Sequence, residues 1–159
     1  MTVCPFFHIG ILVPNLEEAQ DKFTRLFGIS FTAVASAQYE IIRPESGTRI
    51  SRSSRMCYST DGPPHYELMQ ADASDFFGPP EGMRIHHVGL WTSDVEQAQR
   101  QVREIGLRTD AETRDALGQL NVFFTNPQDA YGIRFEFLPE AKRAGWEKFI
   151  ASRDPGYLT

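Results

Sequence analysis

Cysteine is scarce in this chain of 159 residues, and so are long apolar runs. The two cysteines, Cys4 and Cys57, are too few for a disulfide framework, which excludes the small disulfide-stabilised secreted folds. The apolar run PFFHIGILVP at residues 5–14 is too short to span a membrane, and no basic segment precedes it as in a secretory signal. We therefore expect reduced thiols, a cytoplasmic location and no membrane partner, with this run forming the first strand.

Basic clusters are also missing. The chain has 16 lysines and arginines against 21 aspartates and glutamates, a formal net charge of −5, and no run rich in Lys and Arg. Proteins that follow a phosphate backbone need such a run, so nucleic acid is excluded as a partner. A content of 41% hydrophobic and 23% charged residues is typical of a globular domain, and 159 residues are enough for one such domain.

An internal duplication organises the sequence. Residues 8–29 align with residues 87–108 without a gap. Five identical positions fall in the same order within these 22 residues, which indicates a real repeat. The identical positions are His8 and His87, Gly10 and Gly89, Glu17 and Glu96, Ala19 and Ala98, and Gln20 and Gln99.

Each copy predicts a strand followed by a helix and further strands. Asn15 and Asp94 are helix N-caps, each with a Glu or Gln three residues later, and the helices are expected over 16–27 and 95–105. Strands follow around the turns TDGPP and NPQDAY. We expect one domain over 1–159, with a first module at 5–74, a linker at 75–83, a second module at 84–139 and a helical tail at 140–159.

Two segments outside this pattern carry open alternatives. Residues 30–55 are rich in Ser and Arg and are expected to be partly loop, so their arginines are solvated or, alternatively, bind a carboxylate or a CoA phosphate. The tail places three apolar side chains on one helical face, which is expected to dock on the body of the protein or on a dimer mate. The arginines are Arg43, Arg49, Arg52 and Arg55, and the tail residues are Trp146, Phe149 and Ile150.

Histidine and glutamate recur at matching places in the two halves. Each half has one histidine on its first strand, His8 or His87, and one glutamate on its last strand, Glu67 or Glu136. A single Glu in a strand more often faces solvent, but the repeated set predicts that two imidazoles and two carboxylates meet at one divalent-metal site. His86 must face the other side of its strand and is expected to be structural. His65 shares the face of Glu67 and either lines the cavity or lies at the surface.

The phrases FHIGILVPNLEEAQ, HYELMQ, IHHVGLWTSDVEQA and GIRFEFLP resemble the vicinal oxygen chelate superfamily, the glyoxalase, bleomycin-resistance and extradiol-dioxygenase group. The resemblance covers residues 6–139 and is greatest to the branch of methylmalonyl-CoA epimerase and glyoxalase-like domains. It implies an α+β fold in which two tandem βαβββ modules form a cupped, mixed eight-stranded sheet, followed here by a short C-terminal helix. It also implies a metal bound by His8, Glu67, His87 and Glu136.

The sequence departs from the epimerase branch in two respects. Epimerases of this branch often carry Gln at the position of Glu67, and a set of two His and two Glu is closer to metal-dependent glyoxalase I. The branch also uses a glutamate that is not a ligand as an acid and base. The stretch GTRISRSSRMCYS has no carboxylate at the corresponding place, and Glu45 and Glu40 are the nearest candidates.

The predicted function is divalent-metal-dependent enzyme chemistry. The metal, one of Zn, Ni, Co, Mn or Fe, would stabilise an enolate while a carboxylate removes and returns a proton alpha to a carbonyl. The candidate catalytic residues are Glu136, Glu67 and Glu45 in an epimerase, isomerase or lyase acting on an acyl-CoA or α-oxo substrate. We expect a homodimer. The alternatives are a non-catalytic binding or resistance protein for an antibiotic or metabolite and, ranked lower, an extradiol-type dioxygenase.

Overall fold

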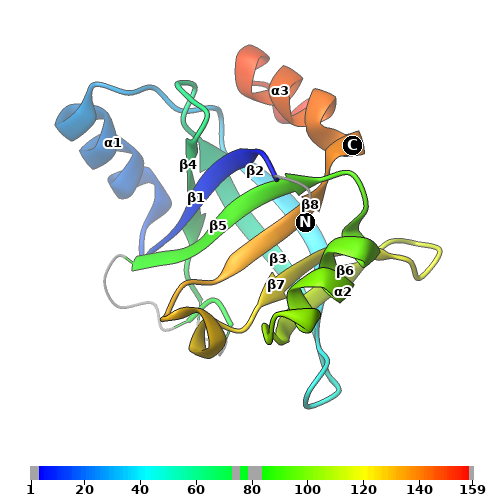
Figure 1. Ribbon diagram of the computed structural model, residues 1–159. Helices are drawn as coiled ribbons and strands as arrows, with labels where there is room; N and C mark the ends of the chain where they lie inside the picture. Colours follow the sequence, from blue (N-terminus) through cyan, green and yellow to red (C-terminus); the bar gives the residue numbers. More distant parts are fainter. Residues whose placement is uncertain (1–3, 73–75, 79–83, 158–159) are drawn as a thin grey trace. The chain divides into compact units, whose positions relative to one another are not determined.

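The computed structural model describes residues 4–72, 76–78 and 84–157 (Figure 1). These residues form eight strands, three α-helices and three short 3-10 turns. The strands are β1 (Phe6–Val13), β2 (Ala35–Arg43), β3 (Thr48–Tyr58), β4 (His65–Gln70), β5 (Arg84–Thr92), β6 (Thr109–Arg114), β7 (Leu120–Thr125) and β8 (Phe135–Pro139). The helices are α1 (Leu16–Phe27), α2 (Val95–Glu104) and α3 (Arg143–Ser152).

The strands form one mixed sheet. Their hydrogen-bonded order is β1-β4-β3-β2-β6-β7-β8-β5. β1 pairs with β4 and β5 pairs with β8 in parallel, whereas β3 with β4, β2 with β6, β6 with β7 and β7 with β8 are antiparallel. The predicted fold class, an α+β fold with a mixed eight-stranded sheet and a short C-terminal helix, is confirmed.

The strand register repeats between the two halves as the alignment predicts. Gly10 of β1 lies opposite Glu67 of β4, and Gly89 of β5 lies opposite Glu136 of β8. The helix starts repeat as well, because the Asn15 side chain accepts the N–H of Glu18 at 2.9 Å and that of Asp94 accepts the N–H of Gln97 at 2.8 Å. The predicted helix starts are therefore confirmed.

The chain divides into two compact units. The His87 unit comprises the described residues of 1–7, 38–53 and 87–143, and the His8 unit comprises those of 8–37, 54–86 and 144–159. The hairpin of residues 38–53 belongs with the second half of the sequence because Ile42 of β2 pairs with Glu112 of β6.

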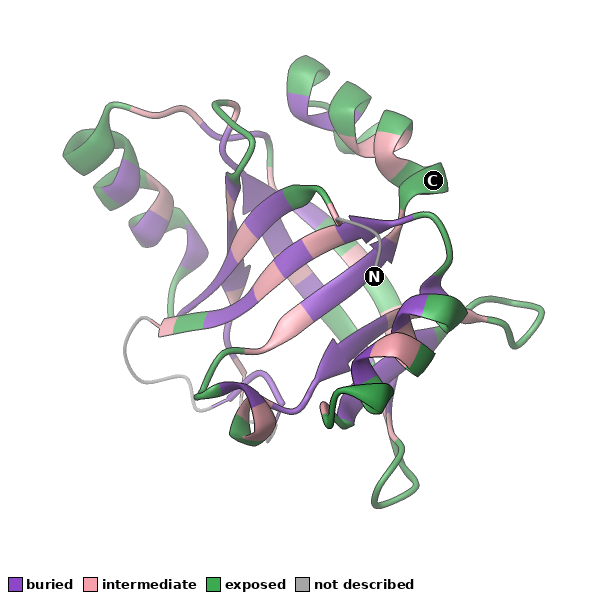
Figure 2. Cartoon of the chain, in the orientation of Figure 1, coloured by how far each residue is buried: buried purple, intermediate pink, exposed green. Residues whose placement is uncertain are grey.

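Each unit has its own apolar core beneath an amphipathic helix. In the His8 unit the buried face of α1 packs on residues of β1, β3 and β4, and Figure 2 shows buried and exposed positions alternating around this helix. In the His87 unit α2 covers the stacked rings of Phe123 and Phe137, whose centroids are 4.7 Å apart. The buried residues of these helices are Leu16, Ala19 and Phe23 in α1 and Val95, Ala98 and Val102 in α2.

Residues 30–55 are partly loop, as expected, but most of the segment is strand. Strand β2 and most of strand β3 lie within this segment, with the turn of residues 44–47 between them. Arg52 is only 6% exposed, and Arg43 is bonded to Asp110, so neither arginine is solvated as expected. Strand pairing with β6, which is distant in sequence, overrides the weak local signal of this Ser- and Arg-rich stretch.

The C-terminal tail docks on its own unit. Phe149 and Ile150 of α3 are buried, and the rings of Trp146 and Phe149 lie 5.0 and 6.1 Å from the ring of Tyr58 in β3. Of the two expected partners for this face, the body of the protein is the one observed. No helix in the described part of the chain combines the length and the apolar character needed to cross a membrane.

A buried carboxylate organises the polar part of the His87 unit. The side chain of Asp110 accepts hydrogen bonds from Arg43 and Arg134, with nitrogen–oxygen distances of 2.6 Å to each guanidinium. The Asp110 side chain is 6% exposed, whereas those of Arg43 and Arg134 are 23% and 15% exposed. One carboxylate therefore neutralises two guanidinium groups that have lost most of their contact with water.

Replacing Asp110 by Ala is expected to lower the free energy of unfolding by roughly 3 kcal/mol, because two largely buried guanidinium groups lose their counter-charge. The measurement is urea unfolding followed by circular dichroism. The control is Asp21→Ala, which removes an exposed partner of Arg25 and should change stability by less than about 1 kcal/mol. Equal effects of the two substitutions would contradict a special role of Asp110.

Candidate metal centre

His8 and Glu67 form a buried ion pair within the His8 unit. His8 lies on β1 and is fully buried, and Glu67 lies on β4 and is 5% exposed. In the parallel pairing of β1 with β4, His8 lies opposite His65, and Gly10 lies opposite Glu67. The Nε2 atom of His8 lies 3.2 Å from Oε2 of Glu67.

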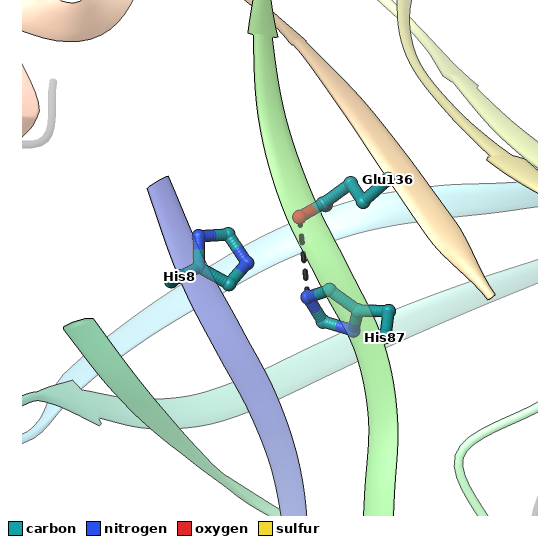
Figure 3. A group of neighbouring side chains, drawn as sticks. All are labelled: His8, His87 and Glu136. Atoms are coloured by element: carbon teal, nitrogen blue, oxygen red, sulfur yellow. Dashed lines mark ion pairs between the residues drawn. The ribbon is translucent and has the colours of Figure 1, made fainter. Parts of the chain in front are cut away.

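His87 and Glu136 form the matching pair within the His87 unit. They lie on the parallel strands β5 and β8, and they are 2% and 9% exposed. The Nε2 atom of His87 lies 3.2 Å from Oε2 of Glu136, the contact drawn as a dashed line in Figure 3. The two pairs are equivalent in the atoms joined, in their separation and in the strands that carry them.

The burial of both glutamates excludes the reading in which they face solvent. A buried carboxylate without a compensating partner is strongly unfavourable, and here each lies beside an imidazole. Imidazole nitrogen and carboxylate oxygen are also the donors that first-row divalent cations take from proteins. The donor set of each pair therefore fits a metal ion, with a carboxylate that supplies negative charge and an imidazole that supplies a neutral ligand.

An aromatic ring lies edge-on to each histidine. The ring of Tyr58 is 5.7 Å from that of His8 at an interplanar angle of 83°, and the ring of Phe124 is 5.4 Å from that of His87 at 78°. Tyr58 also donates a hydrogen bond from its hydroxyl to Oε1 of Glu67. The sequence reasoning did not single out Tyr58, although RMCYS and NVFFT occupy equivalent places and differ at this position.

Glu45, the third candidate catalytic residue, is bonded to an arginine and not to a histidine. It is in the turn after β2, its side chain is 56% exposed, and Oε1 accepts a hydrogen bond from Arg108 at 3.0 Å. Glu40, the other candidate from the sequence, is ion-paired with Arg49 on the exposed surface at 2.6 Å. The structure thus joins His8 to Glu67 and His87 to Glu136, and it joins Glu45 to an arginine.

The two remaining histidines are buried and bonded to backbone carbonyls. Nε2 of His86 lies 2.9 Å from the oxygen of Phe76, and its ring stacks on Phe77. Nδ1 of His65 lies 2.8 Å from the oxygen of Ser59, and burial lowers the pKa of His65. His65 is therefore not at the surface, and both residues serve their surrounding backbone.

The pKa of the Cys57 thiol depends on surroundings that it shares with Glu67. This thiol is fully buried beside the negative charges of Glu67 and Glu17. Burial, with smaller contributions from these two carboxylates, raises the pKa of Cys57 to about 12. The thiolate is the reactive form, so the native protein is expected to protect this cysteine.

A Cys4→Ser variant, in which Cys57 is the one remaining cysteine, should react at pH 8 with a disulfide reagent at least about 100-fold more slowly when folded than in urea. The reason is that only about one thiol in ten thousand is ionised four pH units below its pKa. The release of the coloured thiol measures the rate. Rapid labelling of the native variant would show that the surroundings of Cys57 and Glu67 are open to water.

Comparison with solved structures supports the fold. A hypothetical protein from Bacillus halodurans is 20% identical with a TM-score of 0.62, over 87% of this chain and 95% of that one. A methylmalonyl-CoA epimerase variant from Streptomyces coelicolor, in complex with 2-nitronate-propionyl-CoA, is 21% identical with a TM-score of 0.58 over 87% and 95%. A methylmalonyl-CoA epimerase from Mycobacterium tuberculosis is 23% identical with a TM-score of 0.57 over 87% and 90%.

Comparison with curated proteins gave no match. The model of the Glyoxalase/Bleomycin resistance protein/Dioxygenase superfamily matches residues 7–124, which span the first module and most of the second. The resemblance inferred from the repeated His and Glu motifs is thereby confirmed. Since the match covers well over half of the sequence, the chain belongs to the Glyoxalase/Bleomycin resistance protein/Dioxygenase superfamily.

Proposed function

We propose that this protein is a divalent-metal-dependent enzyme of the glyoxalase and epimerase type. It removes a proton alpha to a carbonyl group and returns it, as an epimerase, isomerase or lyase does. The observation that carries the proposal is the pair of buried His–Glu contacts, each of 3.2 Å, at equivalent positions of the duplicated sequence. A core that served stability alone would gain more from apolar residues at these four positions.

The proposed ligands are His8 and Glu67 from one half and His87 and Glu136 from the other. His8, His87 and Glu136, drawn in Figure 3, are residue types that hold metal ions, and Glu67 completes the repeated set. Two nitrogen and two oxygen donors suit Zn, Ni, Co, Mn or Fe, and leave positions for substrate oxygens. A bound cation of this kind supplies Lewis-acid stabilisation of the enolate that forms when the alpha proton is lost.

The protein's own contribution is to hold and move the proton. A carboxylate oxygen of Glu136 or Glu67 takes the alpha proton, and the electron pair of the broken C–H bond moves into the enolate. Return of a proton to the same carbon from the opposite side inverts its configuration, and return to a neighbouring atom isomerises the substrate. Glu45 is the third candidate acid and base, and to act it must first separate from Arg108.

The substrate class is proposed as an acyl-CoA thioester or an α-oxo compound. The support is the similarity in fold to methylmalonyl-CoA epimerases, one of which is seen with 2-nitronate-propionyl-CoA. A cytoplasmic location is proposed from the two free cysteines, Cys4 and Cys57. The homodimer remains a prediction, which the sedimentation coefficient of the purified protein tests.

The proposed function predicts that protein purified without chelator contains a divalent metal and exchanges the alpha proton of a substrate in heavy water. Glu136→Ala should lose both properties because it removes a ligand and a base at once. The control Glu140→Ala removes an exposed carboxylate four residues away that pairs with Arg143, and it should keep both. Elemental analysis gives the metal content, and proton NMR of a panel of acyl-CoA and α-oxo compounds gives the exchange.

The outcomes separate the alternatives. Metal without exchange on any substrate of the panel would overturn the epimerase chemistry. Protein that neither contains nor accepts a divalent metal would overturn the enzyme proposal and favour a non-catalytic binding or resistance protein. Consumption of oxygen with a catechol would favour the dioxygenase.

A further inference from the structure

Both carboxylate oxygens of Glu67 have a protein partner inside the His8 unit. Oε2 lies 3.2 Å from Nε2 of His8, and Oε1 accepts the hydroxyl hydrogen bond of Tyr58. Tyr58 and Glu67 are directly opposite each other in the antiparallel pairing of β3 with β4, so their side chains leave the sheet on the same face. The hydroxyl therefore reaches the carboxylate from the adjacent strand without crossing the core.

Tyr58 is itself held firmly. Its backbone N–H donates to the hydroxyl of Thr32 at 3.1 Å, and its carbonyl accepts the N–H of Thr32 at 2.9 Å. Its ring, 2% exposed, packs against Trp146 and Phe149 of the C-terminal helix. Because the ring has little room to move, the position of the hydroxyl is set before any ligand binds.

The second repeat has the same ring without the hydroxyl. Phe124 lies opposite Glu136 in the pairing of β7 with β8, as Tyr58 lies opposite Glu67. Phe124 also presents its edge to His87 at nearly the distance and angle at which Tyr58 presents its edge to His8. Packing at this position is therefore satisfied by Phe, and the hydroxyl of Tyr58 serves a purpose that the ring alone does not.

We infer that Tyr58 is a positioning residue, which acts through Glu67. The terminal torsion of a glutamate is broad, so a carboxylate without a fixed partner samples many orientations. The hydroxyl of Tyr58 holds Oε1 and thereby keeps Oε2 on the side of His8. The inference rests on the proposed function, in which Glu67 and His8 are ligands. It implies that the carboxylate of Glu67 is held in one orientation. It also implies that the C-terminal helix, which packs on the ring of Tyr58, supports the site.

The test compares Tyr58→Phe with the wild type and with Tyr66→Phe, using Co²⁺ as the probe. Tyr66 is next to Glu67 on β4, but its ring faces the other side and stacks on Phe27. The readouts are the visible absorption spectrum of the cobalt protein and its affinity for Co²⁺, measured by competition with a coloured chelator. Tyr58→Phe should weaken binding about 10- to 100-fold, the usual effect of removing a hydrogen-bond partner of a ligand, and should shift the absorption bands. Tyr66→Phe should change neither.

A second variant covers the case in which Tyr58→Phe does not fold. Trp146→Ala keeps the hydroxyl but removes one wall of its ring, and it should weaken Co²⁺ binding in the same direction to a smaller extent. If Tyr58→Phe folds and retains the wild-type spectrum and affinity, or if it fails to fold and Trp146→Ala retains them, Tyr58 is a packing residue and the inference is overturned. If the wild type itself binds no Co²⁺, the proposed metal site falls together with the inference.

Discussion

The rest of the structure depends on the need of a buried carboxylate for a partner. Glu67 and Glu136 lie in the interior, where an uncompensated charge is strongly unfavourable, and each is placed beside a histidine of the neighbouring parallel strand. That placement requires a fixed register, since a slip of one residue would turn the glutamate to the opposite face. Gly10 and Gly89, directly across from the two carboxylates, put no side chain beside them.

The duplication explains why the same solution occurs twice, and the differences between the copies show where the two halves have specialised. Helix caps, strand register, His–Glu contacts and the edge-on aromatic ring all repeat. The hydroxyl does not repeat, because Phe124 takes the place of Tyr58. The two carboxylates are thus alike in burial and in their histidine partner, but they differ in what the adjacent strand offers them.

Features that depend on local sequence spacing could be predicted from the sequence. The caps at Asn15 and Asp94 and the equivalence of His8 with His87 follow from spacing alone. Strand β2 could not be placed from the sequence because its pairing partner, β6, lies some seventy residues away, and the local stretch is rich in Ser and Arg. Tyr58 was missed because its role depends on a cross-strand contact, which the sequence does not display.

In the proposed site, one metal ion takes ligands from both halves of the duplicated chain. X-ray absorption spectroscopy of the protein loaded with one equivalent of Zn²⁺ tests it most directly, because it counts the imidazoles around the ion. The account predicts two imidazole nitrogens and carboxylate oxygens at about 2.0–2.2 Å from a single zinc. One imidazole per zinc, or a second zinc bound with equal affinity, would mean that each His–Glu pair acts alone and would contradict the account.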